Sequence, residues 1–414
     1  MRNIKAPSER SCTGCCACYA ICPSDAICIE LNTDGFFEPI VDNSKCIDCG
    51  LCQKVCYKFI STETHTTLMQ DKPVYGVYSS NEQTHFKTTS GGFAFELSKW
   101  GIENGYKIVG VKYDYTLDQA KTIIISSLDD LNLLTGSKYI QSDTSDAFNE
   151  LIQKAKENVD NKYICIGTPC QIFGLRQLIE RRHLKNDFIL VDLFCHGVPS
   201  YLAWKPYIAD KRRELGDLTQ VNFRYKGNGW HQYSIKLNSA NKEYIQFAYC
   251  DPFYRYFFDN IVLNKSCFTC SIRKKDVAAD FRLGDFLGQA YEHREDGISA
   301  VLVATPRAEE IFKKLQSKKY IVVDRKWEAS VCLKSQSTQD YGNILLRNAV
   351  IDQLKENKDD YKQIQNWYYR HLPIKSRIKS ILKRLVTKLP TFMIIFIRKT
   401  SRTLLICGLL LLFD

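Results

Sequence analysis

Cysteine dominates the first sixty positions of this 414-residue chain. Ten of the 18 cysteines precede residue 57, and eight of those ten repeat one frame, C-x2-C-x2-C-x3-C. Thiolates at this spacing ligate 4Fe–4S clusters, with three cysteines on one cluster and the fourth on its neighbour. We therefore expect one cluster on Cys12, Cys15, Cys18 and Cys56, and a second on Cys46, Cys49, Cys52 and Cys22.

Zinc is the alternative metal for such a segment, but it takes four ligands in pairs and fits two copies of a four-cysteine frame poorly. Residues 8–60 instead resemble the two-cluster bacterial-type ferredoxins. Pro23 follows the first copy as in that family, whereas Tyr57 stands where proline usually follows the second, which weakens the turn there. Cys16 and Cys28 lie off the frame, and we expect both to be small buried hydrophobic residues.

The charge is unevenly distributed along the chain. The net charge is +11, but residues 370–414 contribute ten Lys and Arg against one acid, so the body is nearly neutral. The start of the sequence has no apolar leader segment, which predicts a cytoplasmic protein with reduced thiols.

The chain divides into five segments. They are a cysteine module (1–60), a polar linker (61–72), an alternating α/β body in two parts (73–160 and 161–370), and a basic tail (371–414). Buried strands are predicted over 107–114, 122–128, 162–167, 188–194 and 299–305, with helical patterns over 90–105, 170–184 and 200–215. Residues 219–248 alternate as antiparallel strands do, so we expect a mixed sheet.

Two further cysteines fall where an α/β sheet binds ligands, and two more form a C-x2-C pair. Cys170 lies in the first turn of a predicted helix, after the cap Thr168 and Pro169, and Cys195 follows another strand. The carboxyl ends of strands are the usual ligand sites of open sheets. With the C-x2-C pair Cys267 and Cys270, they supply four thiolates for a third 4Fe–4S cluster. A zinc knuckle at the pair, or unrelated thiols, is the alternative.

Two glycine-containing stretches suggest an anion or ring site. Ser90, Gly91 and Gly92 begin a helical pattern, where backbone amides can approach a phosphate. A plain helix cap explains this stretch equally simply. Lys138 lies beside small residues and could pair with a phosphate or a reduced flavin, although a surface loop is the simpler interpretation.

Six stretches follow one another along the chain in this order: SGGFAFEL, GSKYIQSD, GTPCQIFGLRQL, DLFCHGVPS, CFTC and FRLGDF. Together they resemble the coenzyme F420 hydrogenase/dehydrogenase beta-subunit family, over about residues 8–310. The resemblance implies an FAD-binding α/β fold that exchanges electrons between iron–sulfur clusters and a hydride carrier such as coenzyme F420. Relatives are also associated with other organic substrates and with polysaccharide synthesis.

The resemblance also implies roles for individual residues. The flavin would be lined by Ser90, Gly91, Gly92, Gly136, Ser137, Lys138, Tyr139, Gly167, Thr168 and Pro169. A cluster next to the flavin would be held by Cys170, Cys195, Cys267 and Cys270. His196 would hydrogen-bond the flavin or a substrate as the one candidate catalytic residue, with a structural histidine as the alternative.

The basic tail has its own pattern. Residues 376–389 place aliphatic side chains at helical spacing opposite lysines and arginines, which is typical of a helix lying on an anionic membrane. We expect peripheral attachment at the inner face of the membrane, with packing against the body or a partner protein as the alternative. No nucleic-acid binding is expected, because the basic residues alternate with aliphatic rather than aromatic side chains.

Two functions remain open from the sequence. The first is an iron–sulfur flavoprotein oxidoreductase that couples a ferredoxin-type redox partner to a hydride carrier or a small organic substrate, in either direction. The second is a non-catalytic electron-transfer subunit that feeds a catalytic partner subunit. A third, simpler interpretation is that the chain is a zinc-stabilised binding protein.

Overall fold

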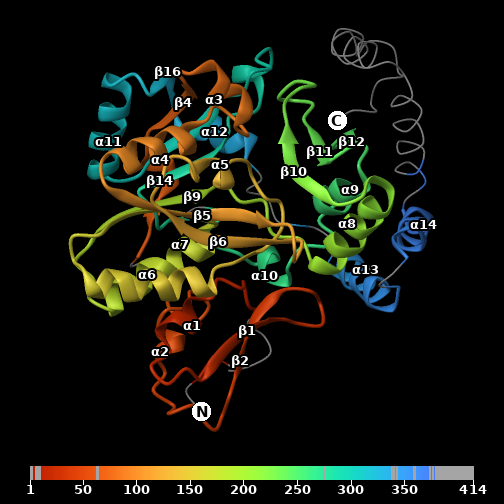
Figure 1. The fold of residues 1–414 in the computed structure, drawn as a ribbon, viewed down its shortest axis with the longest axis horizontal. Coiled ribbons are helices and arrows are strands. Elements are labelled where there is room, and N and C mark those ends of the chain that lie inside the picture. The colour runs from red at the N-terminus through yellow and green to blue at the C-terminus, as the bar shows by residue number, and fades with distance from the viewer. Residues whose placement is uncertain are drawn as a thin grey trace.

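The computed structural model describes residues 3–4, 11–61, 65–274, 276–336, 341, 344–357, 360–372, 374 and 377. Figure 1 shows a small cysteine-rich module (residues 11–60) below a large sheet with helices on both faces, and a smaller antiparallel sheet with further helices beside it. The predicted tail helix over 376–389 lies almost wholly outside the described residues. Within the described ranges, no helix is both long and apolar enough to span a bilayer.

The central sheet has nine strands in the order β16-β4-β15-β14-β9-β8-β5-β6-β7. Neighbouring pairs are both parallel, as for β8 with β9, and antiparallel, as for β5 with β6, so the predicted mixed sheet is confirmed. Its strands are β4 (Val74–Ser79), β5 (Tyr106–Asp114), β6 (Gln119–Ile125), β7 (Ser142–Asp143), β8 (Lys162–Ile166), β9 (Asp187–Leu193), β14 (Phe281–Asp285), β15 (Ser299–Val303) and β16 (Ile321–Trp327).

Three smaller sheets complete the strands. They comprise the hairpin β1 (Ile27–Leu31) and β2 (Phe37–Val41), the pair β3 (Thr67–Leu68) and β13 (Asp276–Val277), and the meander β10 (Leu218–Tyr225), β11 (Ser234–Ser239) and β12 (Glu243–Phe247). The meander is the antiparallel segment predicted over 219–248. The segment predicted as a linker, 61–72, contains β3 and a short 3-10 helix (Met69–Asp71), and Met69 is buried.

The helices pack on the sheets or join the module to the body. They are α1 (Ala17–Ile21), α2 (Leu51–Lys54), α3 (Glu82–Lys87), α4 (Phe93–Glu103), α5 (Leu131–Leu134), α6 (Ser145–Glu157), α7 (Pro169–Arg181), α8 (Tyr201–Leu215), α9 (Pro252–Phe258), α10 (Lys265–Phe268), α11 (Pro306–Ser317), α12 (Ala329–Ser335), α13 (Ile344–Glu356) and α14 (Tyr361–His371). A second 3-10 helix spans Gln289–Tyr291. The helical patterns predicted over 90–105, 170–184 and 200–215 correspond to α4, α7 and α8.

The cysteine module docks on the body through α1 and α7. A Cβ built on Gly174 of α7 would lie 2.9 Å from the Cβ of Ala17 and 3.4 Å from the Sγ of Cys15, so this contact admits no larger side chain. Arg182, at the end of α7, donates to the carbonyl of Ile21 at 2.8 Å. This arginine satisfies a carbonyl that the end of α1 leaves without an intrahelical partner.

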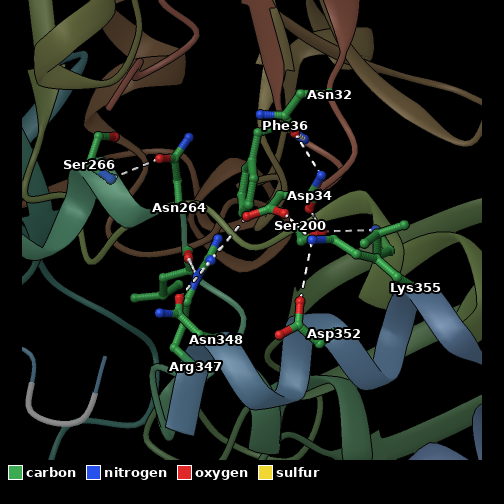
Figure 2. Close-up of polar contacts among 12 residues, drawn as sticks. Asn32, Asp34, Phe36, Ser200, Asn264, Ser266, Arg347, Asn348, Asp352 and Lys355 are labelled. Carbon is green, nitrogen blue, oxygen red and sulfur yellow. Dashed lines mark hydrogen bonds and ion pairs between the residues drawn. The ribbon is translucent and has the colours of Figure 1, made fainter. Parts of the chain in front are cut away.

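The hairpin of the module is held from the opposite side by α13. Arg347 is almost fully buried and donates to Asp34 Oδ2 at 3.1 Å and to the carbonyl of Leu263 at 2.9 Å. Lys355 lies 2.6 Å from Asp34 Oδ1, and the Ser200 hydroxyl donates to the Asp34 carbonyl. Figure 2 shows these contacts meeting at the hairpin tip. One helix therefore fixes both the module and the segment that leads into α10.

We predict that Asp34→Asn loosens this attachment. Burial opposes ionisation of Asp34, but Lys355 and Arg347 outweigh it and hold its pKa below the ordinary value. Because the folded pKa is depressed, the stabilisation is complete above about pH 4, the unfolded pKa, and is lost as the pH falls through the folded value. At pH 7 the variant should lose about 1 kcal/mol, a value reduced for partial exposure.

Urea unfolding of the full chain under nitrogen measures this loss. Asp352→Asn is the matched control, because Asp352 pairs with the same Lys355 from an exposed position on α13. We expect it to change the stability by less than about 0.5 kcal/mol. Equal effects of the two substitutions would contradict the role given to Asp34.

Candidate functional site

The two cysteine repeats of the module adopt the same backbone. Cys16 and Gly50 occupy equivalent positions before α1 and α2, and both are left-handed, with φ of 59° and 71°. Gly14 and Asp48, two residues earlier in each copy, are also left-handed. These left-handed residues bend each C-x2-C-x2-C run into a loop. A turn also forms after Cys56 without proline, because its carbonyl accepts from Phe59 N at 2.9 Å.

One predicted ligand set lines a single cavity. Cys22, Cys46, Cys49 and Cys52 surround it together with Ile27, Val41 and Leu51. The Ala26 amide donates to Cys22 Sγ at 3.4 Å. The sequence assigned these same four cysteines to one cluster, including Cys22 from the other repeat. Four cysteines around one cavity are the donor set that a 4Fe–4S cluster requires.

The other set of the module is gathered nearby. Burial first, and then the charges of Cys15 and Cys56, raise the pKa of the Cys12 thiol. The pKa of Cys18 is raised in the same way by burial, Cys15 and Cys12. A bound metal deprotonates such thiols outright, so their mutual repulsion is a cost that the metal offsets.

The off-frame cysteines behave differently from one another. Cys16 is buried, as predicted, and its thiol donates to the Gly14 carbonyl at 3.3 Å. The same prediction for Cys28 was wrong: Cys28 is exposed on β1. Side chains alternate between the two faces of a strand, and Ile27 and Ile29 occupy the face turned toward the protein interior.

Four cysteines of the body converge although they come from three separate segments. Burial, followed by the charges of Cys267, Cys170 and Cys270, raises the pKa of the Cys195 thiol. Burial and Cys270 raise that of Cys267 to about 12. These thiols are the four that the sequence grouped.

The local structure explains the position of each of these thiols. Cys170 lies in the first turn of α7, where Gln171 closes a capping box on Thr168 by accepting from its backbone N–H at 3.0 Å. Cys195 follows β9 at its carboxyl end. Cys267 lies on α10, where the side chain of the cap residue Asn264 accepts from the Ser266 amide at 2.9 Å. The helix cap at Thr168 and the position of Cys195 after a strand agree with the prediction from the sequence.

A buried ion pair beneath this set was not predicted from the sequence. Arg282 of β14 makes two contacts of 2.6 Å with Asp192 of β9, and both side chains are fully buried. The guanidinium also donates to the carbonyl of Ile272 at 3.1 Å. It thus ties the loop after Cys270 to the strand that ends before Cys195.

The third set lies next to the module. The charge of Cys15 contributes to the raised pKa of Cys170, and the charge of Cys170 contributes to the raised pKa of Cys56, in each case after burial. Cys15 and Cys56 belong to one predicted cluster of the module, and Cys52 of the other cluster is also among the neighbours of Cys56. The three sets therefore form a series through the molecule.

Within the described ranges, no three His, Cys, Asp or Glu side chains form a site for a single metal ion. Such a site draws its sulfurs to about 2.3 Å from one centre. A cubane holds four irons and spaces its sulfur ligands around them.

The predicted flavin stretches are brought together in part. The Ser137 amide donates to Thr89 Oγ1 at 2.9 Å, which joins the Gly136–Tyr139 stretch to the stretch before Ser90. Gly167, Thr168 and Pro169 lie beside the third cysteine set. Gln171, which follows them in α7, donates to Ser142 Oγ at 2.9 Å, three residues after Tyr139.

The glycines of the first stretch also have structural roles. A Cβ on Gly91 would lie 2.0 Å from the Val77 carbonyl, and Gly92 is left-handed at the start of α4. Gly136 is left-handed too, but no atom lies within 4 Å of its added Cβ. A cavity of about 300 Å³ adjoins both stretches, with Thr88, Lys99 and Thr135 in its wall, and the predicted flavin residues are not part of that wall.

Two lysines near these stretches are buried at their ammonium groups. Burial lowers the pKa of Lys138 to about 7, and its Nζ donates to the carbonyls of Leu134 and Thr135 at 3.1 and 3.0 Å. Burial lowers the pKa of Lys226 to about 8, and its Nζ donates to the carbonyl of Ser90 at 2.8 Å. Lys226 was not predicted from the sequence. Its position directly after the strand β10 was the available signal.

His196 lies in an aromatic enclosure. Its ring is 4.8 Å from that of Phe257 and 5.2 Å from that of Tyr341, and Nε2 is 2.7 Å from Asn260 Oδ1. Burial lowers its pKa to about 4, so the ring is neutral at pH 7. The contact with Asn260 occupies one nitrogen, which suits the structural alternative, and its catalytic role stays a prediction.

The arrangement defines a class of protein that carries iron–sulfur clusters and moves single electrons. Residues 11–60 match the 4Fe–4S dicluster domain. Residues 160–328 match the family described as the C terminus of the coenzyme F420 hydrogenase/dehydrogenase beta subunit. The resemblance seen in the sequence is thereby confirmed, and the family match extends beyond residue 310.

Two relatives put this assignment in context. The coenzyme F420-dependent sulfite reductase of Methanocaldococcus jannaschii is 25% identical over 215 residues, which are 52% of this chain and 31% of that protein. This chain therefore spans less than a third of its curated relative. A chain of the F420-reducing [NiFe] hydrogenase complex from Methanosarcina barkeri is 16% identical with a TM-score of 0.45, covering 73% of this chain and 94% of that one.

We predict that Arg282→Met strongly destabilises the protein. The substitution leaves the Asp192 carboxylate buried without its partner, which costs about 3–5 kcal/mol in comparable cases. Anaerobic urea unfolding of the full chain, with iron content measured in parallel, provides the measurement.

The matched control is the double variant Arg282→Met with Asp192→Leu. Replacing a buried ion pair by apolar side chains is often neutral, so most of the lost stability should return. A single variant as stable as the unsubstituted chain would show that the pair is not needed for the fold.

Proposed function

We propose that this chain is an iron–sulfur flavoprotein oxidoreductase. Single electrons pass through three 4Fe–4S clusters to FAD, and from FAD to a two-electron acceptor such as coenzyme F420 or a small organic substrate, or in the reverse direction. When bound, FAD supplies the exchange between one-electron and two-electron chemistry that clusters alone lack.

The observation that carries this proposal is the position of Cys170. It is a neighbour of Cys15 and Cys56 of the module and of Cys267 and Cys270 of the body. If the ferredoxin module did not exchange electrons with the body, nothing would require its cysteines to lie next to four further thiols. The α1–α7 contact at Gly174 keeps the two sets at this separation.

The buried thiols of the third set also favour a metal. Burial, followed by the charges of neighbouring thiols, raises the pKa values of Cys170, Cys195 and Cys267, so these free thiols are protonated and inert. Buried cysteines without a common purpose are usually scattered through the core as small apolar residues. Four of them from three segments around one centre suit a 4Fe–4S cluster, for which Cys170, Cys195, Cys267 and Cys270 would be the ligands.

Lys138 is the residue that this chain offers to a flavin or its phosphates. Its ammonium is held by two carbonyls beside the Gly136–Ser137 turn. Gly136 leaves space above that turn, and the Ser137 amide is fixed by Thr89. Lys226 donates to the Ser90 carbonyl and so holds the Ser90–Gly92 stretch in place. These residues would bind and orient FAD, and they would not take part in bond making.

The alternative is a non-catalytic subunit that hands electrons to a partner enzyme. The family match supports both alternatives, because the family is named for a beta subunit. Turnover separates them: the isolated chain supplied with reduced ferredoxin should reduce F420 or another hydride acceptor. Failure with every acceptor, while the flavin is still reduced by ferredoxin, would favour the electron-transfer role.

We predict about twelve iron and twelve sulfide per chain, and one FAD, after anaerobic purification, at four irons per cubane. Replacing Cys267 by serine should lower the iron to about eight and remove one signal from the electron paramagnetic resonance spectrum. Iron, sulfide and flavin assays provide the measurement.

Cys28→Ser is the matched control, because Cys28 is exposed and lies in none of the three thiol sets. Its iron content should stay at about twelve. Eight irons in the unsubstituted chain would refute the third cluster. Absence of bound flavin would refute the assignment as a flavoprotein.

We predict that FAD binding weakens as the pH rises above 7. The pKa of Lys138 is lowered to about 7, so the side chain carries its charge below this pH and loses it above. An anionic ligand favours the charged form, and its Kd should therefore rise by up to about tenfold per pH unit between pH 7 and 9.

Fluorescence titration of the deflavinated protein with FAD measures the Kd. Lys138→Met should bind FAD with an affinity that does not vary with pH in this range. Lys99→Met is the control, because Lys99 lines the adjoining cavity without contacting the Gly136–Ser137 turn. An unchanged pH profile in Lys138→Met would exclude Lys138 as the anion partner.

A further inference from the structure

Tyr57 is a buried phenol that the proposed electron path does not yet use. It follows Cys56 directly, only 7% of it is exposed, and its ring packs edge-on against Phe173 of α7 at 6.1 Å. It shares a small buried cluster with Cys270, Ile272 and Ala278, with Cys170 packed alongside. The ring therefore spans from the module to the third thiol set.

The Tyr57 hydroxyl has an unmet hydrogen-bonding need. It is buried and has no hydrogen-bond partner among the described residues. A buried hydroxyl left unpaired costs about 1–3 kcal/mol, so native proteins rarely leave one so. The thiol of Cys270 lies beside this hydroxyl, and Cys170 packs against the same buried cluster.

We propose that Tyr57 donates a hydrogen bond to a sulfur of the third cluster and thereby raises the reduction potential of that cluster. The inference rests on the proposed third cluster. Hydrogen bonds to cluster sulfurs are one of the factors that set iron–sulfur potentials, because they stabilise the extra negative charge of the reduced form. Tyr57 is a positioning and tuning residue, and it does not react.

This role gives a reason for the departure from the ferredoxin pattern. Proline at this position could close the turn but could donate no hydrogen bond. The turn after Cys56 is closed without it, by the amides of Phe59 and Ile60, which both donate to the Cys56 carbonyl. The position is thus free to carry a side chain that reaches the body.

The direction of the effect suits electron flow from the module. A donor that favours the reduced third cluster makes transfer from the cluster of Cys12, Cys15, Cys18 and Cys56 more favourable. The same donor leaves the cluster of Cys22 and Cys46 unaffected, because Tyr57 is not among the residues that line its cavity. The donor would therefore act on the last step of the path, from the module to the third cluster.

The test is an anaerobic redox titration of the full chain, followed by electron paramagnetic resonance. Tyr57→Phe keeps the ring and removes the donor. The couple of the third cluster, identified by its absence from Cys267→Ala, should shift negative. At a fixed ambient potential its reduced-to-oxidised ratio should fall about tenfold, which is about 59 mV for a one-electron couple. The couples of the other two clusters should not move.

The matched control is Tyr256→Phe. The Tyr256 hydroxyl is also buried without a hydrogen-bond partner among the described residues, and its neighbours are Tyr369 and Tyr368 rather than thiols. This substitution should leave all three couples unchanged. A shift equal to that of Tyr57→Phe would show a general effect of removing a buried phenol and would overturn the proposal.

A second variant keeps the test decisive if Tyr57→Phe fails to assemble its cluster. Placing 3-fluorotyrosine at position 57 makes the phenol more acidic and a stronger donor at nearly the same volume, so the third couple should shift positive. No shift, or a negative one, in a protein with twelve irons would overturn the role of Tyr57. Eight irons in the unsubstituted chain would instead refute the third cluster itself, so the two failures are distinguishable.

Discussion

The packing of α1 against α7 is the contact on which the rest of the structure depends. Gly174 removes the one side chain that would separate these helices, and Cys15 then reaches the first turn of α7, where Cys170 lies. Arg182 holds the far end of α1, and Arg347 holds the hairpin from the opposite side. The module is therefore fixed at several points, as an electron path through stationary sites requires, and is not a tethered domain that must search for its partner.

The body meets a second physical demand, which is to hold buried charge. Four thiols, the Asp192–Arg282 pair and the ammonium of Lys226 all lie away from solvent. The ion pair and the ammonium are held by an opposite charge or by hydrogen bonds to backbone carbonyls, as buried polar groups generally are. The carboxyl ends of β8 and β9 bring Cys170 and Cys195 together because parallel strands end at one edge of a sheet. The positions of Cys170 and Cys195 are thus set by two neighbouring strands of the central sheet.

Much of this could be read from the sequence, and the limits have physical causes. The cysteine frame predicts two ligand sets from local spacing alone, and the capped start of α7 follows from Thr168 and Pro169. The mixed sheet and the meander followed from residue alternation. The Arg282–Asp192 pair and the contacts of Lys226 were not predicted, because partners distant in sequence leave no periodic signal. Cys28 was assigned by residue type alone, whereas the face of β1 decides its exposure.

The third thiol set draws on segments that are separated by about a hundred residues, from Cys170 to Cys270. The module, by contrast, closes both of its sets within 45 residues, from Cys12 to Cys56. The module can thus take up iron while the ribosome is still making the body, whereas the proposed third cluster would form only after the sheet has closed around its site. Maturation would then have an inherent order, and a chain interrupted before α10 would hold only the two clusters of the module.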